Sequence, residues 1–309
     1  MRKVIGIGES ILDIIFRNEE PQKAIPGGSV FNTLTSLQRL GVETAFISEL
    51  GNDQPGKMIR KFMQDNHMST EYIENYADHK TPVSLAFLNE NNDSDFIFYK
   101  EEGNDSLDVK LPIINQDDIL IIGSYYSVNP SLRNRIVEIL DYAKERKAII
   151  FYDPNFRKPH AHKALRLMPT IIENFEYADI VRGSTEDFVN IYGCDESKAV
   201  YEGNIRFYCR NCICTSGSKG VKLYNGYITK QYDVEPIETV SSIGAGDTFN
   251  AGIIYGLIKN NIGLRDIQYL QEQDWDKIIK IATDLSTEVC KSYENYISNS
   301  FAEEYKNIR

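Results

Sequence analysis

The chain has 309 residues, of which 42% are hydrophobic, so it can bury a sizeable core and lies at the upper limit for one α/β domain. Its formal net charge of −11 and its pI near 5.0 argue against a nucleic-acid or anionic-membrane surface, because such surfaces need clustered lysine and arginine. No stretch approaches transmembrane length, and the first residues lack the features of a signal peptide. We therefore expect a cytoplasmic protein.

The five cysteines, an odd number, suit a reducing compartment better than a disulfide framework. Cys209, Cys212 and Cys214 lie close together in the sequence. A zinc site would need a fourth ligand, whereas residues 207–215 form an apolar run that enters a strand. We therefore expect no metal at these cysteines.

Short apolar runs alternate with helical patterns along most of the chain. This alternation predicts an α/β fold with a mainly parallel sheet and helices on both faces, in which ligands gather at the carboxyl ends of the strands. No linker or internal repeat divides the chain, so we predict a single domain over 1–309. Strands are predicted over 4–8, 43–50, 119–123, 148–153 and 178–181, and helices over 30–40, 131–146 and 274–290.

Two regions interrupt the alternation. Residues 11–26 and 81–101 contain β-rich runs separated by turn residues, a pattern that is typical of hairpins. We predict that they form a small separate sheet.

Two early motifs carry polar side chains that suit a sugar. The end of the first strand is followed by Asp13, while Gly27 and Gly28 precede a helix that carries Asn32 one turn inside it. A carboxylate and a nearby amide can bind vicinal hydroxyls from both sides, and Gly28 would let the backbone come close. Each motif alone is also compatible with an exposed strand aspartate, or with an ordinary turn in which Ser29 caps the helix.

Residues 51–58 have the glycine and lysine spacing of a P-loop and follow a strand. Met58, however, replaces the Ser or Thr whose hydroxyl holds Mg²⁺ in a P-loop. Pro55 also removes one amide from the phosphate cradle. Both differences argue against a P-loop at this position.

The most informative motif is Ser-Ser-Ile-Gly-Ala-Gly-Asp-Thr-Phe-Asn-Ala-Gly at residues 241–252. Gly244 and Gly246 allow a tight turn that opens a buried helix. The amides of Ala245, Gly246 and Asp247 would then converge on an anion, helped by the helix dipole. Asp247 would lie beside a bound phosphoryl group, where it can accept the proton of an attacking hydroxyl. A first-turn acid that merely complements the dipole would not explain the two glycines.

The Gly-Ala-Gly-Asp-Thr-Phe run resembles the C-terminal signature of the ribokinase-like, or PfkB, family of carbohydrate kinases. The other motifs resemble that family in the same order over nearly the whole chain. The resemblance implies a ribokinase-like kinase domain that uses ATP and Mg²⁺, with the small sheet as a lid that covers the sugar and makes a homodimer contact. The implied roles are Asp247 as base, the amides of Gly244, Ala245 and Gly246 as anion hole, and Asp13, Gly27, Gly28 and Asn32 as substrate elements.

Residues 214–220, Cys-Thr-Ser-Gly-Ser-Lys-Gly, are similar to the family's Thr-x-Gly-x-x-Gly turn, which lies along the ATP phosphates. The resemblance implies that the nucleotide is bound by Thr215, Gly217, Ser218 and Gly220. A plain hairpin turn would use the same glycines. The position of the motif before the Gly244 turn favours nucleotide binding.

Two positions depart from the family pattern. The family's metal-linked Asn-x-x-Glu element appears here as Gly-Ser-Thr-Glu at residues 183–186, which keeps only the carboxylate. Glu186 can still organise Mg²⁺ through water, although a first-turn acid of a helix is the alternative. Ser241 stands where many members place an aspartate that helps to bind a monovalent cation, so activation by K⁺ stays open.

The acceptor is indicated by two segments. Residues 153–157 resemble an element of fructokinases and keto-deoxygluconate kinases, which makes Arg157 a candidate for contact with the substrate or the phosphoryl group, or else an ion-pair partner. An acidic sugar would favour a second arginine, whereas the matching lid segment offers Lys100. We therefore predict a neutral ketohexose such as fructose. The alternatives are a 2-keto-3-deoxygluconate kinase, a ribokinase, a nucleoside kinase or a non-catalytic sugar or nucleotide sensor.

Overall fold

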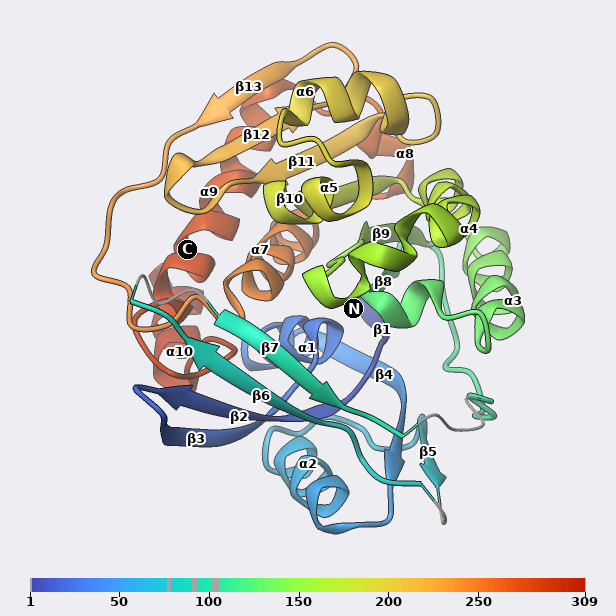
Figure 1. Cartoon of the computed structure of the whole chain (residues 1–309). Coiled ribbons are helices and arrows are strands. Elements are labelled where there is room, and N and C mark those ends of the chain that lie inside the picture. Colours follow the sequence, from blue (N-terminus) through green and yellow to red (C-terminus); the bar gives the residue numbers. More distant parts are fainter. Residues whose placement is uncertain (1, 77–78, 91–93, 102–105, 309) are drawn as a thin grey trace. The chain divides into compact units, whose positions relative to one another are not determined.

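The computed structural model describes residues 2–76, 79–90, 94–101 and 106–308 (Figure 1). By its internal contacts the chain divides into two compact units. Both units contain parallel strands joined through helices, and one of them carries a second, smaller sheet. The predicted α/β class is therefore confirmed. Unit 1 comprises Met1–Ile113, Ile237–Asn261 and Asp276–Arg309, and unit 2 comprises Ile114–Pro236 and Ile262–Trp275.

The first strands of unit 1 are β1 (Lys3–Ile7), β4 (Glu43–Gly51) and β5 (Ile73–Tyr76), and they pair in parallel. Four of the five residues of β1 and eight of the nine of β4 are buried, as is typical of parallel strands that are covered on both faces. The helices that belong mainly to this unit are α1 (Ser29–Arg39), α2 (Gln54–Asp65), α7 (Ala245–Lys259), α9 (Glu272–Val289) and α10 (Asn299–Ile308).

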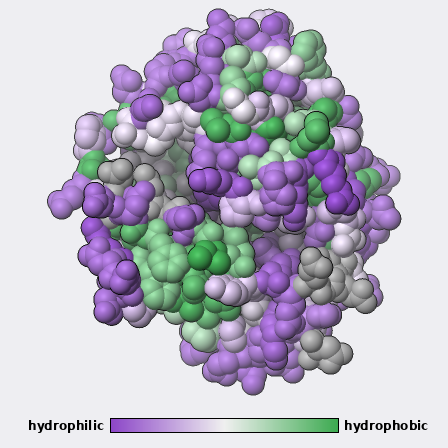
Figure 2. Space-filling view, in the orientation of Figure 1, coloured by the Kyte–Doolittle hydropathy of each residue, from purple (hydrophilic) through white to green (hydrophobic). Residues whose placement is uncertain are grey.

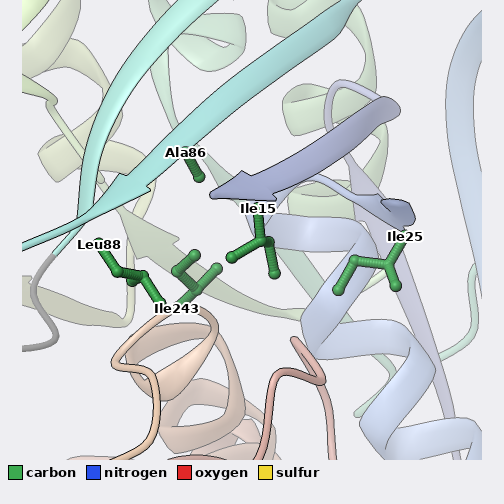
Figure 3. Close-up of a cluster of buried hydrophobic side chains, with 5 residues drawn as sticks. All are labelled: Ile15, Ile25, Ala86, Leu88 and Ile243. Atoms are coloured by element: carbon green, nitrogen blue, oxygen red, sulfur yellow. The ribbon is translucent and has the colours of Figure 1, made fainter. Parts of the chain in front are cut away.

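The small sheet of unit 1 consists of two hairpins, as the sequence predicts. Its strand order is β3-β2-β6-β7, in which β2 and β6 run parallel and the outer pairs antiparallel. One face contributes Ile15, Ile25, Ala86 and Leu88 to a buried cluster that Ile243 completes (Figure 3). Residues 91–93 of the predicted region lie outside the described residues. The strands are β2 (Ile11–Arg17), β3 (Glu20–Gly27), β6 (Val83–Leu88) and β7 (Ser94–Tyr99).

The opposite face of the small sheet is apolar and partly open to solvent. The register places Ile14, Leu85 and Ile97 side by side on this face. Phe87 and Ile97 are 37% and 48% exposed, and the Phe87 ring stacks on Phe16 with centroids 5.0 Å apart. Figure 2 shows a hydrophobic patch where this sheet lies.

Unit 2 contains a six-stranded run in the order β13-β12-β11-β10-β9-β8, of which the last four are parallel. Its strands are β8 (Ile119–Gly123), β9 (Ile149–Asp153), β10 (Ile180–Ser184), β11 (Asn211–Thr215), β12 (Val221–Tyr224) and β13 (Thr229–Tyr232). Its α-helices are α3 (Arg133–Glu145), α4 (Ala164–Tyr177), α5 (Thr185–Tyr192), α6 (Ser197–Val200) and α8 (Leu264–Ile267). Short 3₁₀-helices cover Tyr125–Val128, Lys158–Lys163 and Gly217–Lys219, and a π-turn covers Tyr201–Ile205.

Local sequence explains most element boundaries. Helix α5, for example, begins with a capping box between Ser184 and Asp187, and its C-cap is Gly193, whose φ of 67° is left-handed. The strand predicted over 178–181 begins two residues later than predicted, because Ala178 is the C-cap of α4 and β10 starts at Ile180. The predictions missed β5 and β13, which are only four residues long.

The P-loop-like segment is an ordinary helix start. Asp53 is the N-cap of α2 and accepts a hydrogen bond from the Gly56 amide at 2.9 Å, so this amide already has an internal acceptor. The second carboxylate oxygen of Asp53 accepts from the amide of Thr81. This arrangement agrees with the argument against a P-loop.

All five cysteines are free thiols. Burial raises the pKa of Cys209 to about 12 and that of Cys212 well above its usual value. These thiols are therefore unreactive near neutral pH. Among the described helices, none combines the length and the apolar composition needed to span a bilayer.

Candidate active site

The glycine turn before α7 requires glycine for two reasons. Gly244 has a φ of +78°, and a Cβ at this position would lie 2.1 Å from the backbone oxygen of Asn295. An alanine would therefore meet both an unfavourable backbone conformation and the main chain of a distant segment. The turn delivers Asp247 to the first turn of α7, where the residue is only 4% exposed.

The amides of this turn are not equivalent. The Ala245 amide donates to the carbonyl of Ser242 at 3.2 Å, so it is already engaged within the turn. The Gly246 amide lies in the first turn of α7, where a backbone amide has no acceptor within its own helix. Of the three amides expected to bind an anion, the Ala245 amide is thus the least suited. The Gly246 amide lies at the positive end of the helix dipole, which favours an anion.

Asp247 is oriented by α1. The side-chain amide of Asn32 donates to Asp247 Oδ2 at 2.8 Å, and the Thr33 hydroxyl donates to the Asp247 carbonyl at 2.9 Å. Asn32 Oδ1 is buried and has no hydrogen-bond partner within the described residues. The sequence predicted that Asn32 and Asp13 act together on the substrate, and the structure adds that the Asn32 amide hydrogen-bonds Asp247.

Asp13 is buried on β2, with an exposed fraction of 4%, so the alternative of an exposed strand aspartate is wrong. Asp13 Oδ2 accepts from the side-chain amide of Asn295 at 2.8 Å, and Oδ1 accepts from the hydroxyl of Ser84. Gly27 lies against this carboxylate, since a Cβ there would be 2.0 Å from Asp13 Oδ2. We call Asp13, Asn32, Asp247 and Asn295 the carboxylate cluster.

Sequence reasoning missed Asn295. It lies 282 residues from Asp13 in the chain, in a segment without regular structure and without a motif. The alternative in which Ser29 caps α1 is also wrong. The N-cap is Gly28, and no side chain makes a capping hydrogen bond there. Lys100, predicted at the substrate, forms an ion pair with Glu9 at 2.9 Å in the same unit.

In unit 2, residues 214–220 form the connection between β11 and β12, which we call the hairpin turn. These strands are antiparallel, so the hairpin alternative describes the local structure correctly, and it does not exclude nucleotide binding. The Ser216 amide donates to the Gly220 carbonyl at 2.9 Å and closes the turn. Gly217 and Ser218 are exposed, and nothing lies within 4 Å of a Cβ built on Gly217. The tip of the turn is open to a ligand.

A buried ion pair supports the hairpin turn. Arg182 on β10 contacts Asp153 Oδ2 at 2.9 Å, and the two side chains are only 5% and 1% exposed. The same guanidinium donates to the hydroxyl of Thr215. Sequence reasoning missed Arg182, although a lone arginine in the otherwise apolar or small run of β10 was a usable signal.

Arg157 and Glu186, predicted at the substrate and at Mg²⁺, form a loose ion pair with atoms 3.9 Å apart. Their side chains are 36% and 59% exposed, so both remain accessible to a ligand. Sequence reasoning did not single out Asp187. Its carboxylate accepts a hydrogen bond from the Phe156 amide at 2.6 Å and so fixes the segment that carries Arg157 to α5. Within the described residues, no group of three or more His, Cys, Asp or Glu side chains is placed to hold a metal ion.

Ser241 is buried, and its hydroxyl accepts from the Ile243 amide at 3.2 Å. It therefore holds the turn before α7 and supplies no carboxylate to a cation.

Comparison with known proteins gives consistent matches. The model of the pfkB family carbohydrate kinases matches residues 1–301. A probable fructokinase-4 of Arabidopsis thaliana is 25% identical over 285 residues, which cover 87% of this chain and 86% of the relative. An ATP-dependent 6-phosphofructokinase of Thermoanaerobacterium thermosaccharolyticum is 27% identical over 271 residues, covering 83% and 81%.

The fold also matches solved structures. A double-mutant fructokinase of Vibrio cholerae O395, determined with fructose, ADP and a potassium ion, superposes with a TM-score of 0.84. The match covers 99% of this chain and 98% of that protein at 19% sequence identity. The likeness therefore establishes a shared fold.

Proposed function

Because the chain belongs to the pfkB family of carbohydrate kinases, we propose that it transfers the γ-phosphoryl group of ATP to a primary hydroxyl of a neutral ketohexose such as fructose. The observation that carries this proposal is the buried Asp247 in the first turn of α7, held by Asn32 directly after the Gly244 turn. A carboxylate at a helix start next to an available amide matches what in-line phosphoryl transfer needs from a protein.

Asp247 is the general base of the proposed reaction. It accepts the proton of the acceptor hydroxyl as the hydroxyl oxygen attacks the γ-phosphorus and ADP leaves on the opposite side. The hydrogen bond from Asn32 fixes the rotation of the carboxylate, so less conformational freedom has to be lost when the reactive geometry forms. The Gly246 amide and the helix dipole stabilise negative charge on the phosphoryl group.

The nucleotide is assigned to unit 2, in which Thr215, Gly217, Ser218 and Gly220 would follow the phosphates. Two features support this assignment: the open tip of the hairpin turn, and the anchoring of Thr215 by Arg182. Glu186 fits Mg²⁺ held through water, since its carboxylate is 59% exposed in the first turn of α5 and Mg²⁺ takes its other oxygens from phosphates. Bound Mg²⁺ would neutralise phosphate charge.

We also propose a homodimer formed through the small sheet. Its outer face combines the exposed Phe87 and Ile97 with the half-buried Ile14, Phe16 and Leu85. An apolar sheet face of this kind is typical of an interaction surface.

The test is an ADP-release assay with fructose, ribose, 2-keto-3-deoxygluconate, fructose 6-phosphate and nucleosides, each with and without Mg²⁺ and K⁺. We expect Mg²⁺-dependent ADP release that requires sugar, with the highest kcat/KM for fructose. Release that no acceptor stimulates would refute the kinase function and favour a sensor. A preference for a nucleoside or an acidic sugar would refute the acceptor assignment alone.

A further inference from the structure

Unit 1 contains a small, partly open pocket that the motifs did not identify. Its walls come from the segment after β1, from the last residues of β4, from Tyr76 at the end of β5, and from the segments before β6 and after β7. It therefore lies at the carboxyl ends of parallel strands, where α/β proteins bind their ligands. The polar groups that line it include Glu9, Glu49, Lys80 and Lys100.

We propose that this pocket holds the part of the acceptor sugar that is remote from the reacting hydroxyl, and that the Glu9–Lys100 ion pair makes it selective for neutral acceptors over anionic ones. The proposal rests on the kinase function proposed above and specifies its substrate class. Glu9 acts as a specificity residue because its carboxylate lies against the ammonium group that would otherwise attract an anion.

The pocket is linked to the carboxylate cluster through α1. The Glu9 carbonyl packs on Gly28 so closely that a Cβ on Gly28 would lie 2.1 Å from the carbonyl oxygen. Gly28 is the N-cap of α1, and Asn32, which holds Asp247, follows about one helical turn later. The same helix start therefore packs against the pocket residue Glu9 and carries the amide that holds Asp247.

The charges that line the pocket include no surplus of cations. Three carboxylates, those of Glu9, Glu49 and Glu101, line it with the ammonium groups of Lys80 and Lys100 and with His79. Glu9 and Lys100 contact each other at 2.9 Å, with side chains 28% and 33% exposed, while Glu49 accepts from the Tyr76 hydroxyl.

Recognition of a carboxylate or phosphate requires a surplus of cationic donors, and the carboxylates here remove that surplus. A polyol, in contrast, can donate to the carboxylates and accept from the lysines. Selectivity thus follows from unfavourable charge as much as from favourable contacts.

The test compares kcat/KM for fructose with kcat/KM for 2-keto-3-deoxygluconate and fructose 6-phosphate. In Glu9→Gln, the ratio of anionic to neutral acceptor should rise by about 10-fold, a typical size for a change in one pocket contact. In Lys100→Gln, the same ratio should fall. The opposite signs separate the charge effect from a general loss of packing. The backbone contact of residue 9 with Gly28 is kept in both variants.

The matched control is Glu43→Gln, which breaks the Lys3–Glu43 ion pair of 3.2 Å at the amino ends of β1 and β4. This variant should leave the acceptor ratio unchanged. An unchanged ratio in both pocket variants, or a wild-type preference for the anionic acceptors, would overturn the charge selectivity while the kinase function stands. If the wild type phosphorylates none of these acceptors, both proposals fail.

Discussion

The carboxylate cluster of unit 1 and the hairpin turn of unit 2 are built in opposite ways. Asp247 and Asp13 are bound by amides that lie 215 and 282 residues away in the chain, and all four residues of the cluster are buried. The tip of the hairpin turn is exposed, and the turn is closed by hydrogen bonds between residues only three or four positions apart. A buried polar network tolerates little change, whereas an exposed local turn tolerates more.

The two regions suit two different requirements of phosphoryl transfer, which are the orientation of a base and the binding of phosphates. The base must be held in one orientation, and long-range side-chain contacts achieve this. A turn that follows phosphates can instead rely on backbone amides, which need only the correct local conformation.

The largest expected effect is that of Asp247→Asn, which keeps the size of the side chain but removes the base. We expect kcat to fall by at least about 100-fold, the lower range for loss of a general base, while the Kd for ATP is retained. Steady-state kinetics and calorimetric ATP binding measure the two quantities. Asp65→Asn at the exposed end of α2 is the matched control. Near-normal turnover of the Asp247 variant would remove this residue from the mechanism.

The buried support of the hairpin turn should be the next most sensitive. Arg182→Met leaves the Asp153 carboxylate buried and without its cation, which should lower the free energy of unfolding by about 3–5 kcal/mol. The double variant Arg182→Met/Asp153→Leu should recover much of this loss, because no charge then remains buried. Urea denaturation of the three proteins measures the difference. Equal stability of the single variant and the wild type would contradict the structural role of the pair.

Alanine substitutions at one glycine of each region compare how much change the two turns tolerate. Gly244→Ala should lower the free energy of unfolding by about 2–5 kcal/mol, because a left-handed φ and a clash with Asn295 add together. Gly217→Ala should cost only about 1–2 kcal/mol, since its φ of +54° is also left-handed but the space around it is open. Thermal unfolding of both variants tests this order. The opposite order would contradict the contrast between a crowded and an open turn.

The smallest effect concerns assembly. Ile97→Lys on the outer face of the small sheet should convert a dimer to a monomer without a change in thermal stability of more than a few degrees. Ile113→Lys, at a residue that is 70% exposed elsewhere in unit 1, should leave the assembly unchanged. Light scattering after size exclusion reports the mass. A wild type that is monomeric at every concentration would exclude the proposed contact.

Local patterns predicted much of the fold. The strand over 119–123 was predicted at its observed bounds, because a continuous apolar run marks a buried parallel strand. The two β-rich regions were correctly assigned to a small sheet, because turn residues between short β-rich runs mark hairpins. The short strands β5 and β13 were missed, since their four residues each carry too little pattern. The roles assigned to Arg157 and Glu186 stay predictions, and the structure adds only that they face each other.

The sequence by itself determined the glycine turns, the helix that follows Gly244 and the family, because each of these depends on residues that are neighbours in the chain. Only the tertiary structure decided which amide serves which carboxylate. Asn32 meets Asp247, Asn295 meets Asp13, and Lys100 meets Glu9. Such partners are chosen by the packing of distant segments, and a local pattern of residues contains no record of that choice.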